Sequence, residues 1–107
     1  MIAAFKLLQQ QNKQCTLLLV GPFEEDLDPL SEKSRMEIDS NSNIITTGYQ
    51  QDIRIFLAVS DILVFPSYRE GFPNVVMQAG AMDLPSIVSN INGCNEIVMD
   101  GRNGLLV

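Results

Sequence analysis

Residue types that can do chemistry gather in one short segment, PSYREGFPN, at residues 66–74. Glu70 supplies a carboxylate there, and Pro73 marks the expected start of a helix, because a first-turn proline loses no hydrogen bond. The first backbone N–H groups of a helix lie at the positive end of its dipole and can bind anions such as phosphates. Pro73 has no N–H, so Asn74 and Val75 are the expected phosphate donors.

Glycines and polar residues around this segment extend the candidate site. Gly71 is expected to let a ligand approach closely and to adopt a φ that other residues avoid. Gly21 and Gly93 can each serve a turn, a ligand, or both, and the sequence leaves these roles open. Four apart on the expected helix, Asn74 and Gln78 share one face.

Other side chains near these loops have plainer interpretations. Tyr68 and Phe72 are more typical of packing than of stacking on a base, although Phe72 stays among the candidate ligand contacts. Glu96 is expected to stabilise a helix start, and Tyr49 is a weaker candidate for contact with a base.

The apolar pattern predicts the elements that would hold these residues. Strands alternate with helices five times, which predicts an α/β fold with a Rossmann-like, doubly wound parallel sheet. Such sheets bind ligands at the C-terminal ends of strands, here in loops 21–28, 47–52, 66–74 and 89–95. The apolar runs CTLLLV and DILVF are expected to be the most buried strands. Helices are expected at residues 2–10, 29–39, 51–59, 73–82 and 95–99, and strands at 15–20, 43–46, 61–65, 84–89 and 104–107.

Composition and charge exclude several classes of function. The 107 residues carry a net charge of −6 without a basic run, which argues against nucleic acid and anionic lipid as direct partners. The chain has no histidine, so a Cys/His zinc site and a Ser-His-Asp triad are excluded, and no metal is expected. Cys15 and Cys94 are expected to be buried, small apolar residues in a reduced, cytoplasmic protein.

The order of short motifs carries a family resemblance. PS-x-x-EGFPN, DLPSIVSN, INGCNEIV and DGRNGLLV follow one another between residues 66 and 107. This block resembles the C-terminal, nucleotide-sugar-binding domain of glycosyltransferase family 4, which has the GT-B fold. It looks close to the bacterial members that build capsule, lipopolysaccharide and other surface glycans. The resemblance extends over residues 1–107, which would form one partial C-terminal domain.

The resemblance implies a role for two residues in particular. In the family, the glutamate that matches Glu70 contacts the hydroxyls of the donor sugar, and a carboxylate there can favour positive charge at the anomeric carbon. An ordinary solvated loop carboxylate is the alternative. The family usually has a second glutamate at the position of Gln78, where it holds the ribose hydroxyls. An amide there forms hydrogen bonds without charge assistance, so ribose binding is expected to be weaker.

The resemblance also indicates what these residues lack. In the family, a central strand precedes the first helix seen here, and an Arg and a Lys after that strand hold the diphosphate. Arg69 and Arg102 are the nearest candidates by loop position, and neither matches the pattern. The N-terminal domain, which would bind a glycan or lipid-linked acceptor and make any membrane contact, is also expected to be missing.

Two functions therefore remain open. The first is part of a retaining enzyme that transfers a sugar from a nucleotide donor, expected to be UDP-linked, without a cofactor. The second is a non-catalytic or vestigial nucleotide-binding module, favoured by Gln78. A nucleotide-sugar epimerase needs a histidine, which the chain does not have. The 107 residues alone are expected to transfer no sugar.

Overall fold

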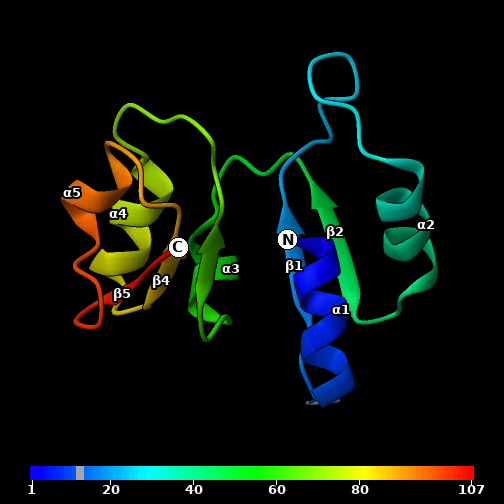
Figure 1. Ribbon diagram of the computed structural model, residues 1–107, viewed down its shortest axis with the longest axis horizontal. Helices are drawn as coiled ribbons and strands as arrows, with labels where there is room; N and C mark the ends of the chain where they lie inside the picture. Colours follow the sequence, from blue (N-terminus) through cyan, green and yellow to red (C-terminus); the bar gives the residue numbers. More distant parts are fainter. Residues whose placement is uncertain (12–13) are drawn as a thin grey trace. The chain divides into compact units, whose positions relative to one another are not determined.

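The computed structural model describes residues 1–11 and 14–107 (Figure 1). The chain divides into two compact units, Met1–Asp52 and Ile53–Val107. Each unit has its own helices, its own parallel sheet and its own buried cluster. We describe each unit by itself.

The first unit is a two-stranded parallel sheet with two helices. It contains α1 (Ile2–Gln11), β1 (Leu17–Val20), α2 (Glu32–Ser40) and β2 (Ile44–Gly48). β1 pairs with β2 in parallel, and the register shifts at the end of β1, between Leu19 and Val20. The core of this unit consists of the buried side chains Phe5, Ile38 and Ile44.

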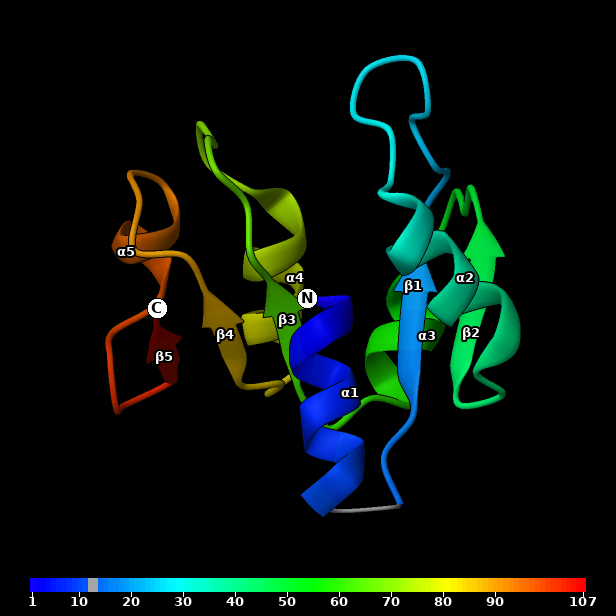
Figure 2. The same ribbon diagram turned by 45° about the vertical axis from the view of Figure 1, so that its right-hand side comes forward.

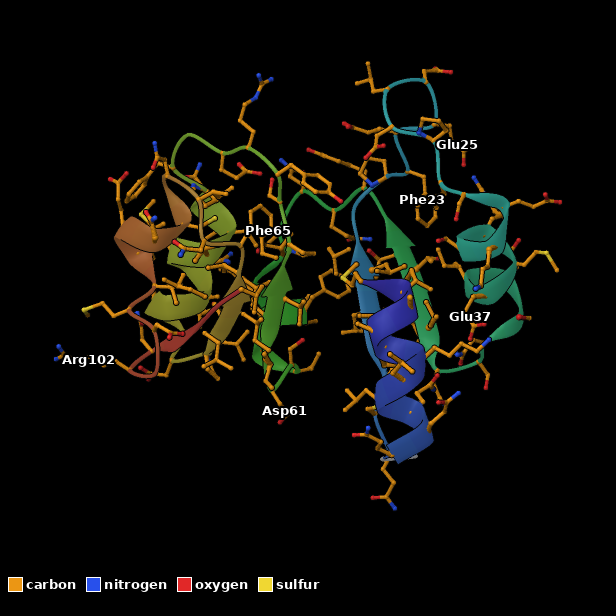
Figure 3. The ribbon with its side chains drawn as sticks, in the orientation of Figure 1. Phe23, Glu25, Glu37, Asp61, Phe65 and Arg102 are labelled. Atoms are coloured by element: carbon orange, nitrogen blue, oxygen red, sulfur yellow. The ribbon has the colours of Figure 1, made fainter. Side chains whose placement is uncertain are left out.

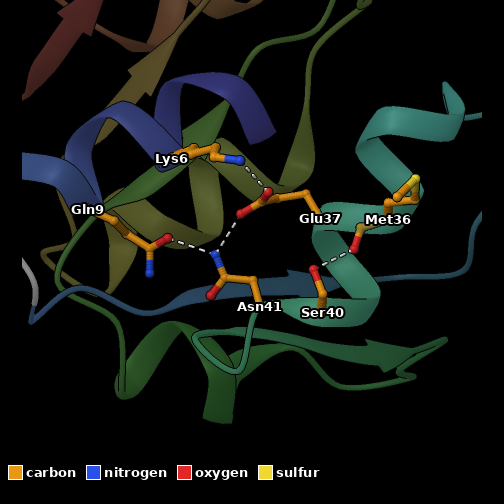
Figure 4. Close-up of polar contacts among 6 residues, drawn as sticks. All are labelled: Lys6, Gln9, Met36, Glu37, Ser40 and Asn41. Carbon is orange, nitrogen blue, oxygen red and sulfur yellow. Dashed lines mark hydrogen bonds and ion pairs between the residues drawn. The ribbon is translucent and has the colours of Figure 1, made fainter.

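Polar side chains fasten the two helices of this unit to each other (Figure 4). Lys6 Nζ on α1 lies 2.8 Å from Glu37 Oε2 on α2. The Asn41 amide, just after α2, donates to Gln9 Oε1 at 2.7 Å and to Glu37 Oε1 at 2.9 Å. These bonds lower the pKa of the Glu37 carboxyl, Lys6 contributing most and Asn41 next. At the other end of α2, the Ser31 hydroxyl caps the helix by accepting from the Ser34 N–H at 3.2 Å.

The second unit is a three-stranded parallel sheet with three short helices. Its elements are α3 (Arg54–Ala58), β3 (Leu63–Phe65), α4 (Asn74–Ala81), β4 (Ser86–Val88), α5 (Cys94–Ile97) and β5 (Gly104–Leu106). The strand order is β3-β4-β5, and Figure 2 shows the three arrows running in the same direction. Val76, Val88, Cys94 and Val98 form the main buried cluster between the helices and the sheet.

The sequence-based prediction of the elements is confirmed. All five helices and five strands occur in the predicted order, with ends that differ by a few residues, and every strand pair is parallel. This is the α/β class with parallel strands that the alternating pattern indicated. The sequence predicts Pro73 in the first turn of this helix. In the structure Pro73 is instead the N-cap residue of α4, since the helix begins at Asn74.

The prediction of which strands are most buried is wrong. β1 and β3 are only partly buried, whereas Ser86 and Val88 of β4 are fully covered. The physical reason is position in the sheet. β4 has a hydrogen-bonded neighbour on each side, whereas β1 and β3 each pair with one strand in their own sheets. An apolar run predicts that a strand can be buried, but its neighbours decide whether it is.

Candidate functional site

Two loops of the second unit lie at the same edge of its sheet. The 66–73 loop follows β3, and residues 89–93 follow β4, which is parallel to β3. Phe65, the last residue of β3, leads into the first of these loops (Figure 3). The C-terminal edge of a parallel sheet is where α/β proteins bind ligands, so this edge is the candidate site.

Glu70 is held by a neighbour in its own loop. The Ser67 hydroxyl donates to Glu70 Oε1 at 2.6 Å, a short distance typical of a bond to a charged carboxylate. Both side chains are partly buried. Glu70 also acts on α5, because its negative charge adds to burial in raising the pKa of the Cys94 thiol. The carboxylate therefore lies near the start of α5 and is hydrogen-bonded within its own loop.

The two loops pack against each other through glycine. Gly93 has a φ of +86°, and a Cβ on it would lie 2.1 Å from the carbonyl oxygen of Gly71 and 3.3 Å from Pro73 Cδ. Such a distance to a backbone oxygen is a steric clash, so only glycine fits at this position. The Gly93 N–H donates to Glu96 Oε1 at 3.3 Å, which confirms Glu96 as a helix-start carboxylate.

The expectation for the backbone of Gly71 is wrong. Gly71 is not among the glycines with positive φ, and a Cβ on it would meet no atom within 4 Å. The left-handed backbone belongs instead to Gly93, on the neighbouring loop. A contact between loops distant in sequence sets this requirement, and local sequence does not reveal it.

The start of α4 has open hydrogen-bond donors. Val76 N–H donates to the Pro73 carbonyl at 3.1 Å. Among the described residues, no acceptor receives a hydrogen bond from the N–H of Asn74 or Val75. Pro73 itself is buried and fixes where the helix begins. Asn74 and Val75 therefore present two free N–H groups next to the Glu70 loop, as an anion-binding helix start requires.

One face of α4 remains exposed. Asn74 and Gln78, four residues apart, are both exposed, whereas Val76 and Ala79 are buried against the unit. The shared face expected for Asn74 and Gln78 is therefore open, and a ligand at the helix start can reach both side chains.

The two aromatic residues of the loop are largely exposed. Tyr68 is 98% exposed and Phe72 is 51% exposed, so the packing interpretation is wrong for Tyr68 and only partly correct for Phe72. Both rings remain accessible to a ligand. Of the cysteines, Cys94 is fully buried as expected, but Cys15 is only partly buried.

The remaining candidates lie elsewhere. Gly21, in the first unit, has a φ of +129°, and its N–H donates to the Gly48 carbonyl at 3.0 Å. Tyr49, in the same unit, is 75% exposed. Arg102 precedes β5 and therefore belongs to the N-terminal edge of its sheet, opposite the 66–73 loop, and Figure 3 shows it pointing away from its unit. Arg102 is therefore no substitute for a diphosphate-binding residue.

The loop after β1 forms a hollow in the first unit. Arg35 on α2 pairs with Glu25 and lies over the Phe23 ring, 5.5 Å from its centre, so this loop contacts α2. Three of the residues that line the hollow are acidic, and they would repel phosphate. Its lining consists of Pro22, Phe23, Glu24, Glu25, Asp28 and Leu30.

Other kinds of site find no support in the described chain. Over residues 1–11 and 14–107, no three His, Cys, Asp or Glu residues are grouped so that they could hold a metal ion. None of the helices described there is long and apolar enough to cross a membrane.

Sequence reasoning missed two participants in this site. Ser67 has no role in the predicted set, although a hydroxyl three residues before a loop carboxylate is a usable signal. Gly93 was left open between turn and ligand, and the structure shows that it supports the loop that contains Glu70. The structure brings Glu70, Gly71, Phe72, Asn74 and Val75 together around the start of α4, with Gln78 one turn further along.

Comparisons with known proteins place the chain in a family. The family model described as "Glycosyl transferases group 1" matches residues 1–107. The capsular polysaccharide biosynthesis glycosyltransferase CapM of Staphylococcus aureus is 29% identical over 107 residues, which are 100% of this chain and 28% of CapM. A galactosyltransferase of Escherichia coli, named for transfer from UDP-Gal to GlcNAc-diphosphoundecaprenol, is 34% identical over 90 residues, or 84% of this chain and 23% of that protein.

A solved structure supports the same assignment. HepE of Anabaena, in complex with UDP and glucose, superposes with a TM-score of 0.81 at 25% identity, covering 96% of this chain and 29% of HepE. The same protein has also been solved with UDP-glucose. This chain spans less than a third of the length of each of these relatives. Its parallel α/β fold is that of the GT-B glycosyltransferases, and the chain belongs to the group 1 glycosyltransferase family.

Proposed function

We propose that this chain is the donor-binding part of a retaining glycosyltransferase that transfers a sugar from a UDP-linked donor. The observation that carries the proposal is the Glu70 carboxylate, held by Ser67 beside the open N–H groups of Asn74 and Val75. Negative diphosphate and neutral sugar need different partners, and this edge of the sheet offers both within one loop and one helix start. The complexes of HepE with UDP and with UDP-glucose support UDP as the nucleotide.

Each residue of the proposed site has a chemical task. Asn74 and Val75 N–H groups bind the diphosphate and stabilise the charge that develops on it when the bond to the sugar breaks. Glu70 accepts hydrogen bonds from sugar hydroxyls and favours positive charge at the anomeric carbon. Gln78 holds the ribose through neutral hydrogen bonds.

Two further contacts are proposed from their position in the loop. Gly71 and the exposed Phe72 ring lie between Glu70 and the helix start, where a ligand would touch both. The reaction breaks the bond from the anomeric carbon to the diphosphate oxygen and forms one to the oxygen of an acceptor hydroxyl on the same face of the sugar, and the hydroxyl proton passes to the departing diphosphate. No metal or cofactor is needed for these tasks.

The acceptor is proposed from the relatives alone. The names of the relatives from Escherichia coli and Campylobacter jejuni specify diphospho-undecaprenol acceptors, and CapM is named for capsule synthesis. We propose a glycan or lipid-linked acceptor, bound by a further domain outside these 107 residues, in the cytoplasm at the inner face of the membrane. That domain would also make any membrane contact.

A non-catalytic nucleotide-binding module is the second candidate, and Gln78 favours it. A module that has lost catalysis would keep the diphosphate contacts, but Glu70 would not make a UDP-linked sugar bind more tightly than UDP. The two candidates therefore differ in whether the sugar adds to binding.

An NMR titration of the isotopically labelled chain tests the proposal. We expect UDP to shift the amide signals of Asn74, Val75 and Gln78, and UDP-glucose to shift those of Glu70 and Gly71 in addition. ADP-glucose serves as a control for the base. Shifts confined to other segments, or no shifts at all, would exclude a donor site at the start of α4.

A further inference from the structure

We infer that Ser67 is a positioning residue that orients the Glu70 carboxylate toward the donor sugar; this inference rests on the function proposed above. Ser67 would touch neither nucleotide nor sugar. It would act only through the carboxylate that it holds.

The hydrogen-bond distances favour this role over a purely local turn. The Ser67 hydroxyl lies 2.6 Å from Glu70 Oε1 and 3.3 Å from the Arg69 carbonyl oxygen. A hydroxyl has one hydrogen to donate, and the shorter contact to a charged acceptor is the stronger bond. The hydrogen therefore points to Glu70, and the longer contact to Arg69 is secondary.

The bond leaves half of the carboxylate available. In the described part of the chain, no donor reaches Glu70 Oε2. An ionised carboxylate has two oxygens that can each accept hydrogen bonds. The bond between Oε1 and Ser67 favours one arrangement of the side chain, and Oε2 stays free for a sugar hydroxyl.

The backbone around Ser67 is anchored, so the hydroxyl has a fixed base. Ser67 is two residues from Phe65, which is paired with Val88 in the sheet. The other end of the loop rests on Gly93 through the Gly71 carbonyl. A side chain that is already oriented loses less conformational entropy when it binds a ligand, so the sugar should bind more tightly.

The experiment compares UDP and UDP-glucose binding to the chain by NMR titration. The measured quantity is the ratio of the two dissociation constants, which gives the contribution of the sugar. Partial unfolding weakens both ligands by the same factor and leaves the ratio unchanged, so a merely structural role would not alter it.

We expect Ser67→Ala to reduce the contribution of the sugar about fivefold, the effect of one lost hydrogen bond, while UDP affinity stays the same. Ser67→Thr keeps the hydroxyl and should restore the ratio. In a Glu70→Ala background, Ser67→Ala should have no further effect, because no carboxylate remains to be oriented.

Ser60→Ala is the matched control. Ser60 donates to the Phe56 carbonyl at 2.7 Å within the same unit, so this change also removes one serine hydrogen bond. It should leave the ratio unchanged.

The outcomes separate this inference from the proposed function. If Glu70→Ala reduces the contribution of the sugar but Ser67→Ala does not, the positioning role is wrong and the donor site stands. An additional loss from Ser67→Ala in the Glu70→Ala background would also contradict it. If the unmodified chain shows no contribution of the sugar, or Glu70→Ala leaves it unchanged, the proposed role of Glu70 fails, and the role of Ser67 fails with it.

Discussion

The Cα atom of Gly93 lies so close to the Gly71 carbonyl that a methyl group on Gly93 would be 2.1 Å from that oxygen. Two loops that follow neighbouring parallel strands are thereby held together by backbone contact. The position of the loop that contains Glu70 therefore depends on the absence of a side chain at Gly93, twenty-two residues after Gly71.

Gly93→Ala should therefore destabilise the second unit. The left-handed backbone costs about 1–2 kcal/mol for a residue with a Cβ, and overpacking costs about 1–3 kcal/mol more. We expect the free energy of unfolding, measured in urea, to fall by about 2–5 kcal/mol, and UDP-glucose binding to be lost.

Gly101→Ala is the control for that prediction. Gly101 has a φ of +74°, but a Cβ there meets no atom within 4 Å. This variant should lose only about 1–2 kcal/mol, the backbone contribution, and should retain binding. Equal losses for the two variants would mean that the contact with Gly71 has no energetic weight.

Glu70→Ala should separate catalysis from nucleotide binding. In a complete transferase that contains this segment, we expect turnover to fall about a hundredfold or more, because the carboxylate acts where charge develops. UDP affinity, measured by calorimetry, should change by less than about twofold, because the variant keeps all the hydrogen bonds proposed for UDP. Parallel losses of UDP affinity and turnover would place Glu70 at the diphosphate instead.

Gln78→Glu should tighten UDP binding. A charged acceptor in place of a neutral one should contribute on the order of 1 kcal/mol toward the ribose hydroxyls. The gain should be smaller for 2′-deoxy-UDP, which has lost one of those hydroxyls.

Met77→Glu provides the control for charge alone. Met77 is the preceding residue of α4 and is also exposed, but it lies about 100° around the helix from Gln78. The Met77→Glu variant should bind UDP more weakly, because the added carboxylate repels the diphosphate, or with unchanged affinity. A gain from Met77→Glu equal to that from Gln78→Glu would argue against a ribose contact.

The contacts between α1 and α2 predict an acid-dependent loss of stability. The pKa of Glu37 is lower in the folded chain than its ordinary value of 4.5, because Lys6 and Asn41 favour the charged form. The stabilisation that Glu37 gives to the fold is complete above pH 4.5 and is lost as the pH falls through the lowered pKa of the folded chain. Urea unfolding between pH 7 and pH 3, with a probe in the first unit, measures this loss.

Lys6→Gln should flatten that dependence, because it removes the largest cause of the shift. Lys33→Gln, on the exposed side of α2, removes the same charge without a hydrogen bond to Glu37 and should retain the pH dependence. If both variants behave alike, net charge and not the Lys6–Glu37 bond governs acid stability.

The 107-residue chain on its own should transfer no sugar. The proposed acceptor contacts lie outside it, and the advantage of holding two reactants together, roughly 7–11 kcal/mol, would then be lost. Incubation with UDP-glucose and a lipid-linked acceptor, followed by mass spectrometry, should detect no product. Transfer by the purified chain would contradict the assignment of the acceptor site to another domain.

Local sequence was sufficient for the elements and for the outline of the site. An apolar run such as CTLLLV predicts a strand, and the proline before Asn74 predicts a helix start. Both features depend on residues that are neighbours in the sequence. Hence the order of the elements along the chain, the parallel pairing of the strands and the position of the loop containing Glu70 could be predicted.

Features set by distant contacts could not be predicted in the same way. Which strand is most buried depends on its neighbours, so β4 was missed. Gly71 was assigned the backbone that Gly93 adopts, because the contact joins two loops that the sequence separates. Tyr68 is 98% exposed, which its ring alone does not indicate, because burial depends on the distant residues that surround a side chain.

Cys94 gives this edge of the sheet an internal chemical reporter. Its thiol is fully buried at the first residue of α5, beside the loop with Glu70, so a thiol reagent reaches it only while this part of the unit is open. The labelling rate of Cys94 therefore measures how often the unit opens, without an added probe. A bound donor sugar would slow that rate by keeping the loop in place, so reaction kinetics can reveal an occupant too weakly bound for calorimetry.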